Sequence, residues 1–354
     1  QAGVRPLSHV YDLEDGHWEM ADADENVIHD DHRFVEGDAK LIIQQSSNIG
    51  AGKMALDIGA KGLSDVLRGF GFGQLSGSSF PGEARGLLRD PSEWKKVETV
   101  NIAFGQGTAA TGVQLVTALS ALGNQGMLMQ PLLVRRVLDA DGHEVKRWDP
   151  KPMRQVVSPD TARVVLDMMR TVVEPGGTGT RAYIPEYPVA GKTGTGQKPH
   201  LRKRGYADNM WVGTFFGVAP ADDPELSVLV LIDEPKGKRY GGVVAAPAFR
   251  RIMRWSLRYL GVPSPYDTER QVAWLDPAKL ADRRATERTE EADLLALAPP
   301  VSLSHEGDVP VPDFHGKTMD QVRKMAREGG LAVRYLGTGV ARRQSEAPHG
   351  RVPA

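Results

Sequence analysis

The stretch VAGKTGTGQK, residues 189 to 198, contains Gly191-Lys192-Thr193, the letters that end a nucleotide-binding P-loop. A P-loop also needs a glycine five positions before Gly191, so that successive backbone N–H groups can surround the phosphates. Glu186 occupies that position, and its carboxylate would repel a phosphate. Pro188 removes a further backbone donor. The stretch is therefore predicted to be a strand, and the phosphate interpretation fails.

A strand with this sequence can bind an extended peptide. The side-chain period of two places Thr193 and Thr195 on one side and Lys192 on the other. Gly191 and Gly194 leave the backbone open to close approach. Two hydroxyls and unpaired strand amides can hold a peptide that ends in a carboxylate. A Lys-Thr-Gly triplet occurs by chance in about one chain in fifteen of this size, so the triplet alone decides nothing.

Composition narrows the class of protein. The chain has 354 residues, 40% of them hydrophobic, and a net charge of -1, which is typical of a soluble globular protein of two or three domains. The sequence has no broad cluster of basic residues, so nucleic acid is not an expected partner. Cysteine is absent, so disulfides and thiolate metal sites are excluded, and an oxidising compartment is permitted. The chain contains no run of about 18 apolar residues, so no membrane-spanning segment is predicted in it.

Hydrophobic periodicity predicts an α/β (α+β) architecture. The expected elements are a hairpin from His9 to Asp30 around Asp15-Gly16, helices near 38–69 and 111–122, strands at 211–219 and 226–232, and a helix after Pro247. The continuous apolar run at 226–232 indicates a central strand covered on both faces. The arginines of the last helix are expected to form a solvated face.

Two acidic segments are not predicted to bind metal. DADEN at 22 to 26 begins like a calcium loop, but Val27 replaces the required glycine and Arg33 the bidentate glutamate. His29-Asp30-Asp31-His32 cannot direct four consecutive side chains at one ion, so exposed loop charge is the expected state. We assign neither a metal nor a cofactor.

A companion signal to Lys-Thr-Gly lies in QQSSNIG, residues 44 to 50. Ser46-Ser47-Asn48 closes a helical stretch, so these side chains can project from a turn between helices. Ser-x-Asn alone is expected about once by chance in a chain this long, and helix capping is its usual explanation. In this order, however, Ser-x-Asn and Lys-Thr-Gly-Thr are two of the three motifs of the serine acyltransferases that react with penicillin.

From Gln1 to about Val262 the chain resembles the transpeptidase domain of class B penicillin-binding proteins, the D,D-transpeptidases of bacterial cell division and elongation. Beyond the two motifs, the resemblance rests on SSNIGAGKMAL, FGQGTAATGVQL from Phe104, EPGGTGTRA from Glu174 and YGGVVAAPAF from Tyr240. It implies the fold shared with serine β-lactamases, an antiparallel sheet flanked by helices. It also implies serine acyl transfer at D-Ala-D-Ala without a cofactor, binding of β-lactam antibiotics, and partners in the cell-wall synthesis machinery.

The resemblance further implies a location and a domain order. The catalytic domain would lie on the extracytoplasmic face of the bacterial cytoplasmic membrane, with a membrane anchor only in the full-length protein. We expect a transpeptidase domain at 1–263, a charged linker at 264–308, and a small domain at 309–354. The last segment is similar to a PASTA domain, one helix against a three-stranded sheet, and is expected to be incomplete at its C-terminus.

Family roles carry over to matching positions of this sequence. The resemblance implies that Ser46 relays a proton to the leaving amine, Asn48 holds the substrate's peptide carbonyl, and Lys192 reaches across to Ser46. It assigns substrate binding to the remaining motif residues: Thr193, Gly194 and Thr195, with the Thr195 N–H as an oxyanion donor, and Gln106 and Gly107 in a neighbouring wall.

The third family motif, Ser-x-x-Lys, supplies the nucleophile and lies upstream of Ser-x-Asn. None of the 45 residues before Ser46 contains it. Ser92 to Lys95 fits the letters, but one or two such matches are expected by chance, and Ser92 fits a helix N-cap better. We therefore expect that the nucleophile is absent from this chain, which also begins without Met, and that the codons upstream of Gln1 encode it.

Two other functions remain open at this point. A serine β-lactamase is also an acyl enzyme, but the Glu-x-x-Leu-Asn signature for its deacylating water is absent, and Ser47 stands where such enzymes usually carry Asp. A non-catalytic protein could instead use the same site to sense peptidoglycan or β-lactams. An upstream Ser-x-x-Lys behind one transmembrane segment would favour the enzyme.

Overall fold

The computed structural model describes residues 3–20, 27–78, 80–200, 205–265, 309–310, 313–314, 317–328 and 351–352. The chain divides into two compact units, Gln1–Gln271 and Val272–Ala354. The first unit carries both motifs.

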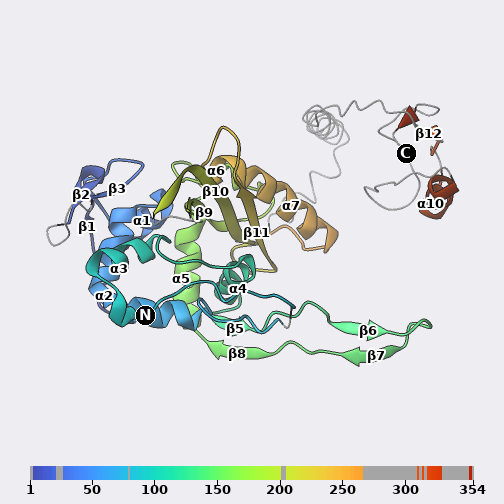
Figure 1. Cartoon of the computed structure of the whole chain (residues 1–354), viewed down its shortest axis with the longest axis horizontal. Helices are drawn as coiled ribbons and strands as arrows, with labels where there is room; N and C mark the ends of the chain where they lie inside the picture. The colour runs from blue at the N-terminus through green and yellow to red at the C-terminus, as the bar shows by residue number, and fades with distance from the viewer. Residues whose placement is uncertain are drawn as a thin grey trace. The chain divides into compact units, whose positions relative to one another are not determined.

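A three-stranded antiparallel sheet carries the Lys-Thr-Gly-Thr motif (Figure 1). Its order is β11 (Leu226–Asp233), β10 (Tyr206–Ala219), β9 (Ala190–Pro199). Lys192 lies opposite Phe216 and Thr195 opposite Gly213. The prediction of a strand antiparallel to 211–219 is confirmed, and because β9 is extended, the segment cannot surround a phosphate. Among the described strands β9 pairs only with β10, so its other edge is available for an added strand.

The prediction that 226–232 is a central strand was wrong. This segment is β11, which pairs only with β10 in the described part of the chain. Its apolar run has another cause, since helix α4 (Gly112–Gly123) and helix α7 (Ala246–Tyr259) both pack against it. Partial cover by helices on both faces therefore does not require a central position in the sheet.

The helical part contains the Ser-x-Asn motif between two helices. Helix α1 (Ala39–Gln45) begins at its N-cap Asp38, and helix α2 (Asn48–Gly69) begins after Ser47, whose hydroxyl accepts a hydrogen bond from the Gly50 N–H. The predicted helical stretch at 38–69 is thus two helices with the expected turn between them. Helix α3 (Lys96–Ala103) packs on α2 so closely that a Cβ at Gly52 would lie 2.6 Å from Val100 Cγ1.

The predicted hairpin around Asp15-Gly16 was also wrong. Strands β1 (Tyr11–Asp12) and β2 (His17–Glu19) flank that turn, which is the 3-10 helix η1 (Glu14–Gly16), but they do not pair. Strand β2 pairs with β3 (Val27–His29), and β1 pairs with β4 (Glu36–Gly37). These strands have two or three residues each, so their alternation is too short to define partners.

Between α4 and the sheet the chain forms a two-stranded ribbon and a helix. Strand β5 (Met127–Met129) pairs with β8 (Pro152–Gln155), and β6 (Arg136–Leu138) pairs with β7 (Glu144–Arg147) farther out on the ribbon (Figure 1). Helix α5 (Pro159–Arg170) then returns to contact both α1 and β9. It therefore lies between the segments that carry the two motifs.

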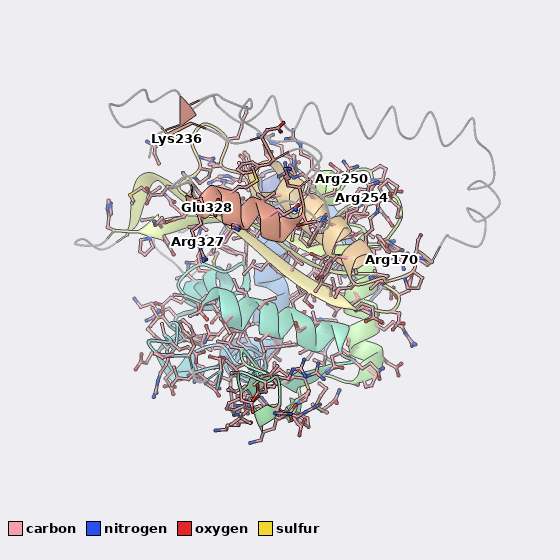
Figure 2. The ribbon with its side chains drawn as sticks, turned by 90° about the vertical axis from the view of Figure 1, so that its right-hand side faces the viewer. Arg170, Lys236, Arg250, Arg254, Arg327 and Glu328 are labelled. Carbon is pink, nitrogen blue, oxygen red and sulfur yellow. The ribbon has the colours of Figure 1, made fainter. Side chains whose placement is uncertain are left out.

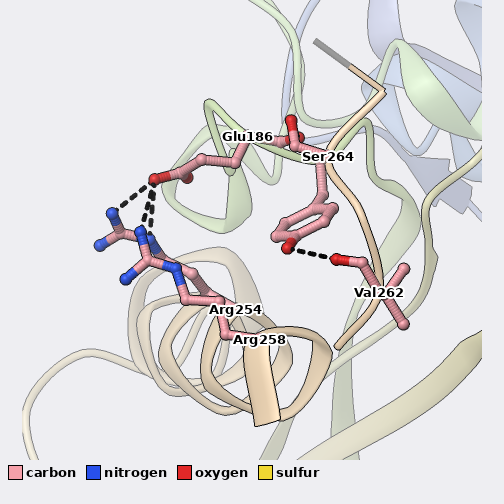
Figure 3. A network of polar contacts seen from close by, with 6 residues as sticks. Glu186, Arg254, Arg258, Val262 and Ser264 are labelled. Atoms are coloured by element: carbon pink, nitrogen blue, oxygen red, sulfur yellow. Dashed lines mark hydrogen bonds and ion pairs between the residues drawn. The ribbon is translucent and has the colours of Figure 1, made fainter. Parts of the chain in front are cut away.

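A buried carboxylate fixes the chain just before β9 to α7 (Figure 3). Glu186 Oε1 accepts hydrogen bonds from Arg254 Nη2 at 2.5 Å and from Arg258 Nη2 at 3.1 Å. Ser264 Oγ donates to the Glu186 carbonyl at 2.7 Å. The arginines of α7, of which Arg250 and Arg254 are labelled in Figure 2, were predicted to form a solvated face. For Arg254 that prediction was wrong, because this side chain is partly buried and pairs with Glu186, whereas Arg258 pairs with Glu186 and stays exposed.

We expect Glu186→Gln to lower the free energy of unfolding by about 2–3 kcal/mol at pH 7, since it removes the buried carboxylate charge to which Arg254 and Arg258 both bond. Burial raises the pKa of Glu186, but Arg254 and Arg258 outweigh it, so the net pKa lies below the ordinary value. The stabilisation is therefore present above the unfolded pKa of about 4.3 and is lost as the pH falls through the lower folded pKa.

Urea unfolding of the wild type and Glu186→Gln at pH 7 and at acid pH measures this effect. The difference between the two proteins should shrink at acid pH. The exposed Glu174→Gln serves as control and should change little at either pH. An equal loss in Glu186→Gln at both pH values would contradict the ion-pair explanation.

In the second unit, α10 (Met319–Glu328) is the described helix, and β12 (Val309–Pro310) pairs with β13 (Arg351–Val352). Phe314, Val322 and Ala326 are buried. Ser264 and Pro265 of the predicted linker at 264–308 are described, and Ser264 is buried and bonded to Glu186. The rest of the linker and most of the PASTA-like segment lie outside the described residues. No helix in the described ranges combines the length and the apolarity needed to cross a bilayer.

Candidate active site

Ser46 and Lys192 are in direct contact although they are 146 positions apart in the sequence. Lys192 Nζ donates to Ser46 Oγ at 2.6 Å and to its neighbour's carbonyl, Thr193 O, at 3.1 Å. Ser46 comes from the turn between α1 and α2, and Lys192 comes from β9. The predicted convergence of these two side chains is confirmed.

The turn that presents Ser46 has an unusual backbone. Ser46 caps the C-terminus of α1 in the left-handed conformation, with φ 60 and ψ 44. A residue other than glycine seldom adopts this region, so it persists where the surroundings fix it. The chain bends there and starts α2 two residues later. Ser46 is exposed as a result, whereas Ser47 is buried.

Asp30 accepts three hydrogen bonds from this turn. The sequence did not indicate this role. Asp30 Oδ2 accepts from Ser47 Oγ at 2.5 Å, and its Oδ1 accepts from the backbone N–H of Asn48 at 2.6 Å and of Ile49 at 3.1 Å. A carboxylate at a helix N-terminus is favourable because it meets unpaired N–H groups and the positive end of the dipole. The prediction of exposed loop charge was wrong for Asp30, which is partly buried.

The side chain of Asn48 is oriented by His29, the last residue of strand β3. Its Nδ2 donates to the His29 carbonyl at 2.8 Å, so one amide hydrogen is committed to β3. Its Oδ1 and its second amide hydrogen remain for other contacts. The direct contact across the site thus joins Ser46 and Lys192. Asn48 is held by two bonds on its own side of the site, from its backbone N–H to Asp30 and from its side chain to the His29 carbonyl.

Lys192 has a perturbed titration. Burial lowers the pKa of Lys192 to about 8. The ammonium form therefore predominates at neutral pH, but the neutral amine is accessible at small cost. A lysine in this range can serve as a charge anchor and can exchange a proton with a neighbouring hydroxyl.

The hydroxyl groups of Thr193 and Thr195 on β9 are both held by hydrogen bonds to other segments. Thr193 Oγ1 lies 2.8 Å from Thr178 Oγ1, and Thr195 Oγ1 accepts from the Gly241 N–H at 3.2 Å. Gly241 begins helix α6 (Gly241–Val244), and a Cβ there would lie 2.1 Å from Thr214 O. Gly194 is equally constrained, since a Cβ would lie 2.4 Å from Thr214 Oγ1. Close backbone approach explains Gly241, whereas a Cβ at Gly194 would meet the Thr214 side chain.

Gln106 and Gly107 lie in the loop between α3 and α4. The Gly107 N–H donates to Tyr206 Oη at 3.1 Å, and Tyr206 begins β10. The Gln106 N–H donates to the Asn101 carbonyl at 2.9 Å. The loop is therefore connected to the sheet that carries Lys192.

Ser92 does not form a nucleophile and base with Lys95. Ser92 lies in the 3-10 helix η2 (Pro91–Glu93), and its Oγ donates to Asp90 Oδ1 at 2.6 Å. The prediction that Ser92 is the N-cap was wrong, because Asp90 has that position. Lys95 is exposed and precedes α3.

One group among the described residues has the composition of a metal site. Asp139, Asp141 and His143 lie together in the exposed turn between β6 and β7. Asp139 Oδ1 accepts from the backbone N–H groups of Asp141 and His143, which is the ordinary bonding of an aspartate in a turn. We assign no ion to it.

Comparisons with known proteins identify the family of the chain. Residues 1–254 match the family described as the penicillin-binding protein transpeptidase domain. The chain belongs to this family. It is 38% identical over 236 residues to "Probable peptidoglycan D,D-transpeptidase PenA" of Neisseria gonorrhoeae, covering 66% of this chain and 38% of that protein. It is 38% identical over 238 residues to stage V sporulation protein D of Bacillus subtilis, covering 66% of this chain and 36% of that protein.

Two solved structures have the same fold. The TP domain of penicillin-binding protein 3 from Burkholderia pseudomallei gives a TM-score of 0.65 at 34% identity, covering 73% of this chain and 74% of that chain. Penicillin-binding protein 3 of Mycobacterium tuberculosis, complexed with aztreonam, gives 0.62 at 31% identity, covering 70% of this chain and 57% of that chain. The expected fold class is thereby established. The chain matches less than two fifths of the length of the two curated relatives.

Proposed function

We propose that this chain is the greater part of a D,D-transpeptidase domain that cross-links peptidoglycan stem peptides by serine acyl transfer. The observation that carries the proposal is the 2.6 Å contact between Lys192 and Ser46 beside an available strand edge. Family membership supports the same reaction. The proposed substrates are stem peptides ending in D-Ala-D-Ala, and β-lactams would occupy the same site.

The residues have complementary roles in this proposal. A serine from a Ser-x-x-Lys motif that is not in this chain attacks the D-Ala-D-Ala carbonyl, forms an ester and releases D-Ala. Ser46 passes a proton to the departing amine, and Lys192 stabilises that relay. An acceptor amine then attacks the ester, which forms the new peptide bond and frees the serine.

The substrate would lie along β9. Its terminal carboxylate is proposed to accept from Thr193 and Thr195, with Gly194 allowing close approach and the Thr195 N–H serving as an oxyanion donor. Asn48 is proposed to hold the peptide carbonyl with its uncommitted amide hydrogen. Gln106 and Gly107 would form the neighbouring wall. No metal or cofactor has a role in these steps.

Peptidoglycan lies outside the cytoplasmic membrane, so we propose that the domain works on the extracytoplasmic face. A membrane anchor elsewhere in the gene product and partners in cell-wall synthesis belong to the same proposal, as does a PASTA-like assignment of 309–354. The linker at 264–308 would then separate the two domains.

Covalent labelling tests the proposal against its alternatives. The full-length gene product is incubated with fluorescent penicillin, denatured and run on a gel, and the loss of label with time is followed. A transpeptidase should retain about one label per molecule for many minutes. Rapid turnover of the penicillin would favour a β-lactamase, and reversible binding without a label that survives denaturation would favour a sensor.

A further inference from the structure

The proposed relay depends on two segments that are far apart in the sequence. Ser46 belongs to the turn after α1, which packs in a core of Leu13, Ile28, Ile42, Ile49 and Val100. Lys192 belongs to the sheet. The 2.6 Å separation of Ser46 Oγ and Lys192 Nζ therefore requires something that holds the end of α1 against the chain that leads into β9.

Two glutamines directly before Ser46 make that connection. Gln45 Nε2 donates to the Gly176 carbonyl at 2.6 Å, and Gln44 Nε2 donates to the Thr171 carbonyl at 3.3 Å. In return the Thr178 N–H donates to the Gln44 carbonyl at 3.4 Å. All three partners lie in residues 171–178, between α5 and the 3-10 helix η3 (Thr180–Ala182).

The receiving segment has little freedom to move. The Gly177 N–H donates to Glu174 O at 2.9 Å, and the Gly179 N–H donates to Val172 O at 2.8 Å. A Cβ at Gly177 would lie 2.2 Å from Val172 O, and Val172 is fully buried. Thr178 then reaches Thr193, the neighbour of Lys192. A continuous series of contacts thus leads from Gln45 to the strand that carries Lys192.

We propose that Gln44 and Gln45 form a clamp that sets the spacing between Ser46 and Lys192, and that Gln45 is a positioning residue for acylation. The inference rests on the proposed function. Ser46 is the C-cap of α1 in the left-handed conformation, and its N–H is directed at the Ile42 and Ile43 carbonyls, so the clamp at Gln45 acts one residue away from the group it positions. Hydrogen-bond strength falls steeply with distance and angle, so a small displacement of α1 weakens the relay.

The test uses Gln45→Met in the full-length gene product, because methionine has a similar length and flexibility but no N–H donor. We expect the rate constant of acylation by benzylpenicillin to fall about tenfold, and the non-covalent dissociation constant before acylation to change less than about twofold. Stopped-flow measurements over a range of penicillin concentrations separate the two constants.

Gln130→Met is the matched control. Gln130 Nε2 donates to the Gly77 carbonyl at 2.6 Å, the same kind of bond at the same length, at the end of strand β5. Both variants should therefore lose similar stability in thermal unfolding, but Gln130→Met should be acylated at the parental rate. Should Gln45→Met not fold, the test uses Gln44→Met instead, which removes the second donor of the clamp.

A double-mutant cycle with Lys192→Ala distinguishes positioning from a general structural effect. If Gln45 acts through the contact between Ser46 and Lys192, Gln45→Met should slow acylation by less than about twofold once Lys192 is absent. A full tenfold loss in the Lys192→Ala background, or a parental rate in Gln45→Met alone, would overturn the inference. Absence of any label on the unmodified protein would instead reject the proposed function.

Discussion

Residues 1–354 alone should form no covalent adduct with penicillin. Acylation needs an activated serine within hydrogen-bond reach of its base and opposite the oxyanion donors. The motif that supplies this serine occurs only as Ser92 to Lys95, where Ser92 bonds to Asp90 and Lys95 is exposed. Loss of a nucleophile typically lowers the rate on the order of a millionfold, so no adduct should accumulate in hours.

Ser46 makes this a strict test. It contacts a lysine whose pKa is lowered to about 8 by burial, the combination found in serine enzymes that use lysine as base. In the proposed arrangement, however, Ser46 lies beside the attacked carbonyl on the leaving-group side, so direct attack would require the site to rearrange. Intact-mass spectrometry after incubation with benzylpenicillin measures the result. An adduct mapped to Ser46 or Ser92 would show that the nucleophile was assigned wrongly.

Lys192→Ala in the full-length gene product should slow acylation by benzylpenicillin about 100- to 1,000-fold, the effect of losing one charge or oxyanion anchor in a preorganised site. Lys192 contributes its positive charge in this account, and its pKa is about 8. The parental rate should therefore fall as the pH rises through that value, and the variant should lack this titration.

The loss should not come from unfolding. Burial that lowers a lysine pKa opposes the charged form, so the folded state gains no stability from the Lys192 ammonium at neutral pH. Lys192→Ala should unfold at the parental temperature or above it. Lys198→Ala is the control on the same strand, since Lys198 pairs with Asp233 and Glu234 near the end of β9. A parental acylation rate in Lys192→Ala would remove this residue from the mechanism.

The sequence was sufficient for the contacts that motifs define. The position of Lys192 on a strand and its contact with Ser46 could be predicted because both motifs match the family in order. The competing P-loop interpretation was excluded because Glu186 stands where a P-loop needs a glycine. The turn at Ser46 was predicted because Ser46-Ser47-Asn48 closes a helical stretch. The roles of these residues, including Asn48 and Thr195, stay predictions.

The supporting contacts could not be predicted. Asp30 is 17 positions from Ser47, and Gln45 is 131 positions from Gly176, so neither pair has a local pattern. Asp30 was interpreted as loop charge because its segment is polar, yet the start of α2 gives its carboxylate three donors. Glu186 likewise appeared only as an obstacle to phosphate, and its arginines come from a helix 68 and 72 positions away.

Errors in the strands have a related cause. The apolar run of β11 reflects the packing of α4 and α7 against the strand, which is only partly buried, and does not indicate how many strands adjoin it. The strands around Asp15 are so short that a turn signal was given too much weight. In both cases pairing depends on tertiary neighbours that alternation alone does not specify.

The central claim is that this site joins peptides by acyl transfer, and the most direct measurement is the product formed from a D-Ala-D-Ala stem-peptide donor. The full-length gene product is incubated with the donor and an acceptor amine, and the products are identified by mass spectrometry. The account predicts release of D-Ala and a new amide between donor and acceptor, both abolished by prior treatment with penicillin. Release of D-Ala by hydrolysis alone, or no change in the donor, would contradict it.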